Sequence, residues 1–157
     1  MKTLKFYLAL VLLLMLPLKL LAADAVFKFT VDRPLTQIYD SLYSTMEEAH
    51  FYIVFEPDIG KNLADQAESW GEDYNLSGLE AIRSMVFCNG WYANQISNKD
   101  PDMLALCPQH LTLIESHGKT TALYARPTVI AGDSPARKVL TDLENEVIAT
   151  IKKGMQE

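Results

Sequence analysis

The sequence predicts an α+β domain, in which a small mixed or antiparallel sheet packs against two or three helices and a C-terminal helix ends the chain. Two long segments, 34–49 and 134–153, repeat apolar residues at the three- and four-residue spacing of amphipathic helices. Short runs rich in β-branched and aromatic residues lie between them. Two of these runs flank the glycine-containing loop 116–119, which predicts a hairpin and makes at least part of the sheet antiparallel.

The first half of the domain is expected to run strand, helix, strand. Val26–Val31 is dense in β-branched and aromatic residues and predicts the first strand. The helix over 34–49 begins at Pro34, a residue that the first turn tolerates. A second apolar strand over 51–55 ends at the turn-forming cluster 56–60. Residues 61–74 alternate charged and apolar residues and predict a short surface helix or an ordered loop.

The second half is expected to contain three more strands and a long final helix. The segment 79–88 ends in a third strand, a short helix follows over 89–96, and a helical turn opens near residue 100. The hairpin strands cover 110–115 and 120–124. In the last helix, over 134–153, Ser134 is the expected N-cap and Gly154 the expected end. A sheet with helices on one face is the natural arrangement, because each helix has one apolar stripe to bury.

The N-terminus predicts an exported protein. Lys2 and Lys5 precede an unbroken apolar run over 6–16, and small residues follow near residue 23, which is the layout of a secretory signal. A membrane-spanning helix needs about 20 apolar residues, and Pro17 and Lys19 interrupt this stretch earlier. We therefore expect residues 1–23 to be removed, with cleavage after Ala23 or Ala25. The remaining single domain, 24–157, is expected to have no stable membrane anchor.

The charge of the mature chain makes nucleic acid an unexpected partner. Removing the three leader lysines from the 14 basic residues leaves 11 against 20 acidic residues, a net charge of −9. Such a surface repels phosphate backbones, whose binding depends on neutralisation by Lys and Arg.

The two cysteines leave two hypotheses open. In an oxidising compartment, Cys88 and Cys107 predict one disulfide, because secreted proteins retain such bonds. However, if a crossover made the third and fourth strands parallel, the two residues would lie at opposite ends of the sheet. A seven-residue strand spans roughly 23 Å, whereas a disulfide needs Cα atoms within about 7 Å. Bonded and free thiols therefore both remain open.

Free thiols would be the candidate ligands or nucleophiles of this chain. Cys107 and His110 have the spacing of one ligand pair, which falls short of a complete zinc or haem motif. Haem or copper(I) are the cofactors considered on this basis, with Cys88 as a third candidate ligand. The metal itself is left unknown, and no catalytic motif is found in the sequence.

Several central motifs resemble an uncharacterised family, the domain of unknown function 302. They are the segment 85–89, Asp100-Pro101, Cys107-Pro108, the strand 111–115 and Gly118-Lys119-Thr120. The likeness covers about residues 26–127 and implies a small α+β domain, often dimeric, in a periplasmic or secreted bacterial protein. Family members often have Pro-Cys where this chain has Cys107-Pro108, so the resemblance points to Cys88 more than to Cys107.

Three functional hypotheses follow. The leading one is a non-enzymatic exported binding or accessory module, expected to be a homodimer, for a small-molecule ligand that the sequence does not identify. The first alternative is a thiol-dependent redox enzyme that uses Cys88 or Cys107. The second alternative is a structural subunit of a complex in the cell envelope.

Overall fold

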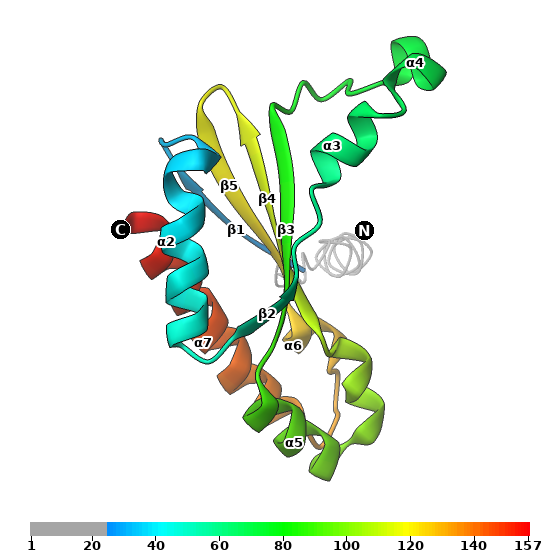
Figure 1. Ribbon diagram of the computed structural model, residues 1–157. Coiled ribbons are helices and arrows are strands. Elements are labelled where there is room, and N and C mark those ends of the chain that lie inside the picture. The colour runs from blue at the N-terminus through cyan, green and yellow to red at the C-terminus, as the bar shows by residue number, and fades with distance from the viewer. Residues whose placement is uncertain (1–24) are drawn as a thin grey trace, which may run out of the picture.

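The computed structural model describes residues 25–157, and the predicted secretion signal at residues 1–23 lies outside them. Figure 1 shows the arrangement of the elements. They are β1 (Val26–Val31), α2 (Leu35–Glu48), β2 (Tyr52–Phe55), α3 (Ile59–Ala64), α4 (Ala67–Trp70), the 3-10 turn η1 (Gly71–Asp73), β3 (Ala81–Cys88), α5 (Gly90–Lys99), η2 (Pro101–Leu106), β4 (Gln109–Ser116), β5 (Lys119–Ala125), α6 (Pro127–Ile130) and α7 (Arg137–Gln156). Within the described residues, no helix is long and apolar enough to cross a membrane.

The five strands form one sheet in the order β1-β5-β4-β3-β2, and every neighbouring pair is antiparallel. This confirms the α+β class and the predicted β4–β5 hairpin, in which Ser116 pairs with Lys119. The parallel arrangement considered for β3 and β4 is wrong, because Phe87 pairs with Gln109 in an antiparallel register. The chain returns through α5 and η2 at the same end of the sheet, so no crossover is needed.

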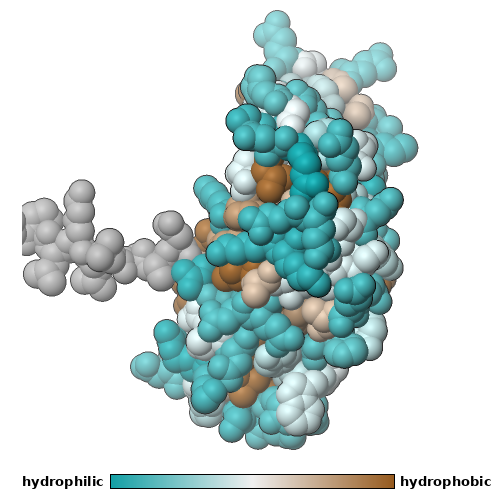
Figure 2. All heavy atoms as spheres, turned by 90° about the vertical axis from the view of Figure 1, so that its left-hand side faces the viewer, coloured by the Kyte–Doolittle hydropathy of each residue, from teal (hydrophilic) through white to brown (hydrophobic). Residues whose placement is uncertain are grey.

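One face of the sheet is covered by α2 and α7, which lie side by side on the left of Figure 1. Their apolar stripes meet inward-facing strand residues in a single core, whose largest fully buried side chains include Tyr124, Phe51, Phe87, Leu42 and Ile151. The outer surface of this helix layer is mostly hydrophilic (Figure 2). Each helix therefore buries its apolar stripe and exposes its polar side, as the helical spacing of apolar residues in the sequence predicts.

Gly154 lies inside α7 and does not close it, so the expected role as a helix end is wrong. A Cβ added at Gly154 would lie 2.8 Å from Leu42 Cα and 3.0 Å from the Thr45 Cβ. Glycine thus allows the last turns of α7 to approach the backbone of α2 closely. The helix continues to Gln156, and Met155 in this last turn is fully buried.

The start of α7 also differs from expectation, since it begins at Arg137 instead of residue 134. The Ser134 hydroxyl accepts a hydrogen bond from the Ala136 N–H over 3.1 Å and donates one to the Asp100 carboxylate. Ser134 therefore closes a turn before the helix and joins it to the end of α5. This hydrogen bond of Ser134 therefore forms two residues before Ala136, which is the N-cap residue of α7.

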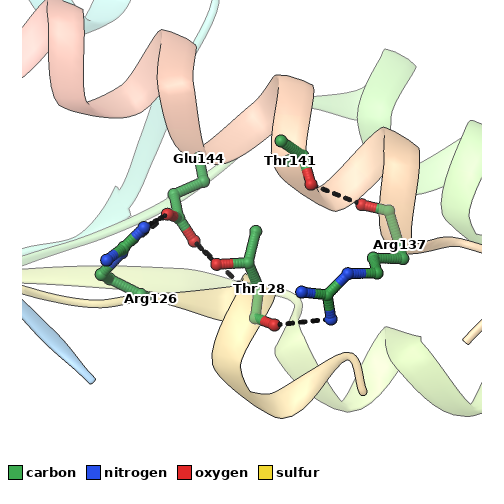
Figure 3. Close-up of polar contacts among 5 residues, drawn as sticks. All are labelled: Arg126, Thr128, Arg137, Thr141 and Glu144. Atoms are coloured by element: carbon green, nitrogen blue, oxygen red, sulfur yellow. Dashed lines mark hydrogen bonds and ion pairs between the residues drawn. The ribbon is translucent and has the colours of Figure 1, made fainter. Parts of the chain in front are cut away.

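A buried carboxylate joins α7 to the short helix α6, an element that the sequence did not predict (Figure 3). Glu144 is 2% exposed, and its carboxylate accepts hydrogen bonds from Arg126 Nε at 2.7 Å and the Thr128 N–H at 3.0 Å. The Thr128 hydroxyl donates a further bond. Burial raises the pKa of Glu144, but the bonds from Thr128 and Arg126 outweigh it and hold that pKa below its ordinary value.

Candidate functional site

Residues 59–80, which we call the arm, leave the sheet after β2 and return at β3, and α3 and α4 extend away from the sheet at the upper right of Figure 1. None of its residues is buried. The arm is nevertheless held at both ends. At its start Asp58 forms an isolated antiparallel bridge with Arg83 of β3, and at its end Glu80 accepts bonds from the His117 and Gly118 N–H groups in the β4–β5 turn.

Two features inside the arm fix its course. Asn75 exchanges two hydrogen bonds of 3.0 Å with the backbone of Leu79 and so closes the loop before β3. Gly60 passes the β3 edge closely, since a Cβ there would lie 3.0 Å from the Ile82 nitrogen. The arm therefore lies along the part of β3 that extends past the end of β2, where the sheet edge would otherwise be open.

A cavity of about 450 Å³ lies between the arm and β3. This volume falls in the range of about 300–1,000 Å³ that is typical of small-molecule pockets. Its wall combines aromatic, apolar and charged residues: Trp70, Tyr74, Leu63, Leu79, Ile82, Lys61, Arg83, Asp58, Asp73 and Glu80. Two of the carboxylates, Asp58 and Glu80, already accept backbone hydrogen bonds.

Arg83 is the unusual member of this wall. Its guanidinium carbon lies 4.0 Å from the centre of the Tyr39 ring, a cation–π contact with α2. Its Nε is buried and has no hydrogen-bond partner. The Tyr39 hydroxyl donates to Glu56, and burial followed by this bond raises the pKa of Tyr39. A buried donor without an acceptor is destabilising by about 1–3 kcal/mol, so this Nε is an unusual feature of the strand.

The predicted cysteines lie at the opposite end of β3. Cys88 ends β3 and Cys107 precedes β4, and both are half-buried free thiols that border one cavity with Phe51, Tyr92 and Leu143. Because β3 and β4 are antiparallel, the strand geometry brings the two cysteines to the same end of the sheet. The topological objection to a disulfide is therefore wrong, and the pairing itself stays a prediction.

The surroundings of the thiols do not resemble a ligand site. Their shared cavity holds about 10 Å³, which is about the space of one water molecule. Burial raises the pKa of the Cys107 thiol, and the neighbouring Cys88 raises it further. A raised pKa lowers the fraction of the reactive thiolate at neutral pH. Neither haem nor another organic molecule fits in this cavity.

His110 is not brought into this cavity. It is exposed on β4 opposite Val86 and borders a separate hollow with Pro108 and Tyr124. Across residues 25–157, no group of three or more His, Cys, Asp or Glu side chains is placed to hold a metal ion. Cys107 and His110 therefore border different cavities, and their pairing as ligands stays a prediction.

Sequence reasoning missed the arm cavity because its wall comes from segments that carry no shared motif. One signal was present, since Arg83 is the one charged residue of the strand Ala81–Cys88, whose other residues are apolar apart from Ser84. A charged residue inside a strand either points to solvent or serves a particular contact. Only the tertiary structure distinguishes the two, by placing this guanidinium over the Tyr39 ring.

Comparisons with known proteins agree with this fold. A family model described as "Domain of unknown function DUF302" matches residues 27–157. A crystal structure of an uncharacterised conserved DUF302 protein from Bacillus stearothermophilus is similar, with a TM-score of 0.72, 17% sequence identity, and coverage of 83% of this chain and 98% of that chain. At this identity the likeness shows the fold alone. No curated protein matches the chain.

Proposed function

Because this chain belongs to the DUF302 family, whose domain has no assigned function, we propose from its own geometry that it is an exported, non-enzymatic module that binds a small organic anion in the arm cavity. The observation that carries the proposal is that Arg83, a permanently charged guanidinium, lines the wall of a cavity of ligand size. A carboxylate or sulfonate oxygen is the acceptor that a guanidinium prefers.

The rest of the wall suits an anion with an apolar body. Trp70 is 44% exposed beside the cavity, and Tyr74 and Leu79 offer further apolar surface. Lys61 adds a second positive charge to a wall that also carries Asp58, Asp73 and Glu80, and it pairs with the exposed Asp65 at 3.4 Å. Ligand pockets commonly combine such apolar walls with a few convergent polar groups.

A probe with this chemistry tests the proposal directly. Anilinonaphthalene sulfonate combines an aromatic body with one anionic group, and its fluorescence rises on transfer to an apolar site. We expect saturable binding with one site per chain. Arg83→Gln should weaken that binding about 10- to 100-fold, because a hydrogen bond to a charged group contributes roughly 1.5–3 kcal/mol.

The matched control is Lys138→Gln, which removes one positive charge from an exposed pair with Asp142 on α7. This variant should bind the probe as the unchanged protein does. Equal binding by the unchanged protein and Arg83→Gln, with both folded by circular dichroism, would contradict the proposal. If the probe binds as expected, its displacement by small carboxylates would identify the natural ligand class.

A thiol redox centre is the second candidate function, favoured by the position of Cys88 and Cys107 at one end of the sheet. The raised pKa of Cys107 weighs against a nucleophilic thiolate, and the cavity beside it has no room for a substrate. We therefore place the redox function second. Replacing each cysteine by Ser should leave probe binding at the arm cavity unchanged.

We further propose that the mature protein is a homodimer in the bacterial periplasm or outside the cell. The sheet face opposite α2 and α7 supports this, because its central residues Ile82, Val86, Ile114 and Leu123 are apolar and only half-buried. Light scattering during size-exclusion chromatography should give twice the chain mass. Ile114→Lys should yield monomers, whereas Val129→Lys on α6 should not. Cell fractionation and intact mass of material from the native host test export and cleavage.

A further inference from the structure

A further hollow, of about 470 Å³, lies at the opposite end of β3 from the arm cavity. We call it the aromatic groove, and its principal lining residues are His50, Tyr52, Asn89, Trp91, Tyr92 and Glu146. Tyr52 pairs with Cys88, so the residues that follow Cys88 begin beside the start of β2. The eight residues of β3 separate the groove from the arm cavity by roughly 23 Å.

The aromatic side chains of the groove are unusually accessible. Trp91 is 68% exposed and Tyr52 is 52% exposed, although both rings would gain from burial. Trp91 lies in the first turn of α5, whose N–H groups are already capped by Asn89 at 3.0 and 3.2 Å. The turn is therefore held in place while the indole ring remains uncovered.

Hydrogen bonds position the other rings. The Tyr92 hydroxyl donates to Glu146 on α7 over 2.6 Å. Burial, followed by this bond, raises the pKa of Tyr92 to about 12, so the phenol keeps its proton at neutral pH. His50 adopts a left-handed backbone conformation with φ of 62°, and its Nδ1 lies 3.2 Å from the Tyr52 hydroxyl. Non-glycine residues rarely adopt this conformation, and such strain gathers at functional sites.

The charges in and around the groove select the ligand class. Glu146 lines the groove, Asp142 lies one turn before it on α7, and no Lys or Arg is among the lining residues. Aromatic faces beside carboxylates attract organic cations, because the ring face is negative and a bulky ammonium group sheds water readily. The net charge of −9 on the chain after residue 23 favours the approach of cations as well.

We propose that the aromatic groove is a binding site for organic cations of the quaternary or alkylated ammonium class, and that it is separate from the anion site in the arm cavity. The ring faces of Trp91 and Tyr52 contact the alkylated ammonium group. Glu146 supplies the opposite charge without losing its bond from Tyr92, since a carboxylate accepts several hydrogen bonds.

Choline and its neutral isostere, 3,3-dimethyl-1-butanol, test this proposal. The chain has two tryptophans, so a Trp70→Phe background leaves Trp91 as the fluorescent reporter. We expect choline to change this fluorescence saturably, with a dissociation constant in the millimolar range. The neutral isostere should bind at least five-fold more weakly, because it has the same shape without the charge.

Variants then locate the site. Trp91→Ala and Tyr52→Ala, measured by calorimetry, should each weaken choline binding about three- to thirty-fold, while Glu146→Gln should weaken it and leave the fold intact. Arg83→Gln should leave choline binding unchanged, which separates this proposal from that for the arm cavity. Equal binding of choline and the isostere, no binding up to about 50 mM, or an unaffected Trp91→Ala variant would each overturn the inference.

Discussion

Replacing Gly154 by Ala should destabilise this protein, although the same exchange in most helices is stabilising. An Ala inside a helix is favoured over Gly by up to about 1 kcal/mol. At this position, however, the added carbon would lie 2.8 Å from Leu42 Cα and 3.0 Å from Thr45 Cβ, so α2 and α7 must separate. Forcing a methyl group into a packed contact costs about 1–3 kcal/mol. We expect a net loss of about 1–2 kcal/mol in the free energy of unfolding.

Urea unfolding followed by circular dichroism measures this loss. With a slope of about 2 kcal/mol per molar urea, the midpoint should fall by roughly 0.5–1 M. Gly90→Ala in α5 is the matched control, because a Cβ there meets nothing within 4 Å. That variant should match or exceed the stability of the unchanged protein. A midpoint for Gly154→Ala at or above that of the unchanged protein would refute the steric reasoning.

Three more predictions concern the fold and the thiols. Glu144→Gln should lower the free energy of unfolding by about 1.5–3 kcal/mol at pH 7, because Arg126 and Thr128 lose a buried charged acceptor. Folding lowers the pKa of Glu144, so the stabilisation from its carboxylate is complete above the ordinary pKa of 4.5 and is lost as the pH falls. The free energies of unfolding of Glu144→Gln and of the unchanged protein should therefore converge below that pH. Asn89→Ala should cost about 0.5–2 kcal/mol in thermal or urea unfolding through the lost cap of α5; an unchanged midpoint would contradict the capping geometry. Iodoacetamide at pH 8 should modify Cys107 much more slowly in the native protein than in urea, which mass mapping would show. Equal rates would mean that the Cys107 thiol is not shielded. If neither condition gave a reaction until a reductant was added, the thiol would be in a disulfide.

Local patterns predicted the regular elements well, because their signals lie within a few residues. The strand Val26–Val31 has the expected bounds, and α2 differs from the expected helix by one residue at each end. Residues 61–74 were expected to be a short helix or an ordered loop, and the structure places short helical pieces there. The missed element was α6, whose four residues are too few to show a period.

Pairing between distant strands was the step that the sequence left open. The predicted order of elements was compatible with either direction of β4 relative to β3, and the choice decided where Cys107 lies with respect to Cys88. The same limitation applies to the candidate sites. Arg83 and Trp70 border one cavity, and Trp91 and Glu146 border another, although neither pair shares a motif or a recognisable spacing.

By itself, the sequence determined the α+β class, the apolar faces of α2 and α7, and the acidic character of residues 24–157, since these depend on composition and on periods of two to four residues. Only the tertiary structure decided the antiparallel order of the sheet, the close contact at Gly154 and the two hollows at the ends of β3. The physical reason is that a cavity or a close helix contact is made by residues far apart in the chain, whose proximity depends on how all the elements pack together.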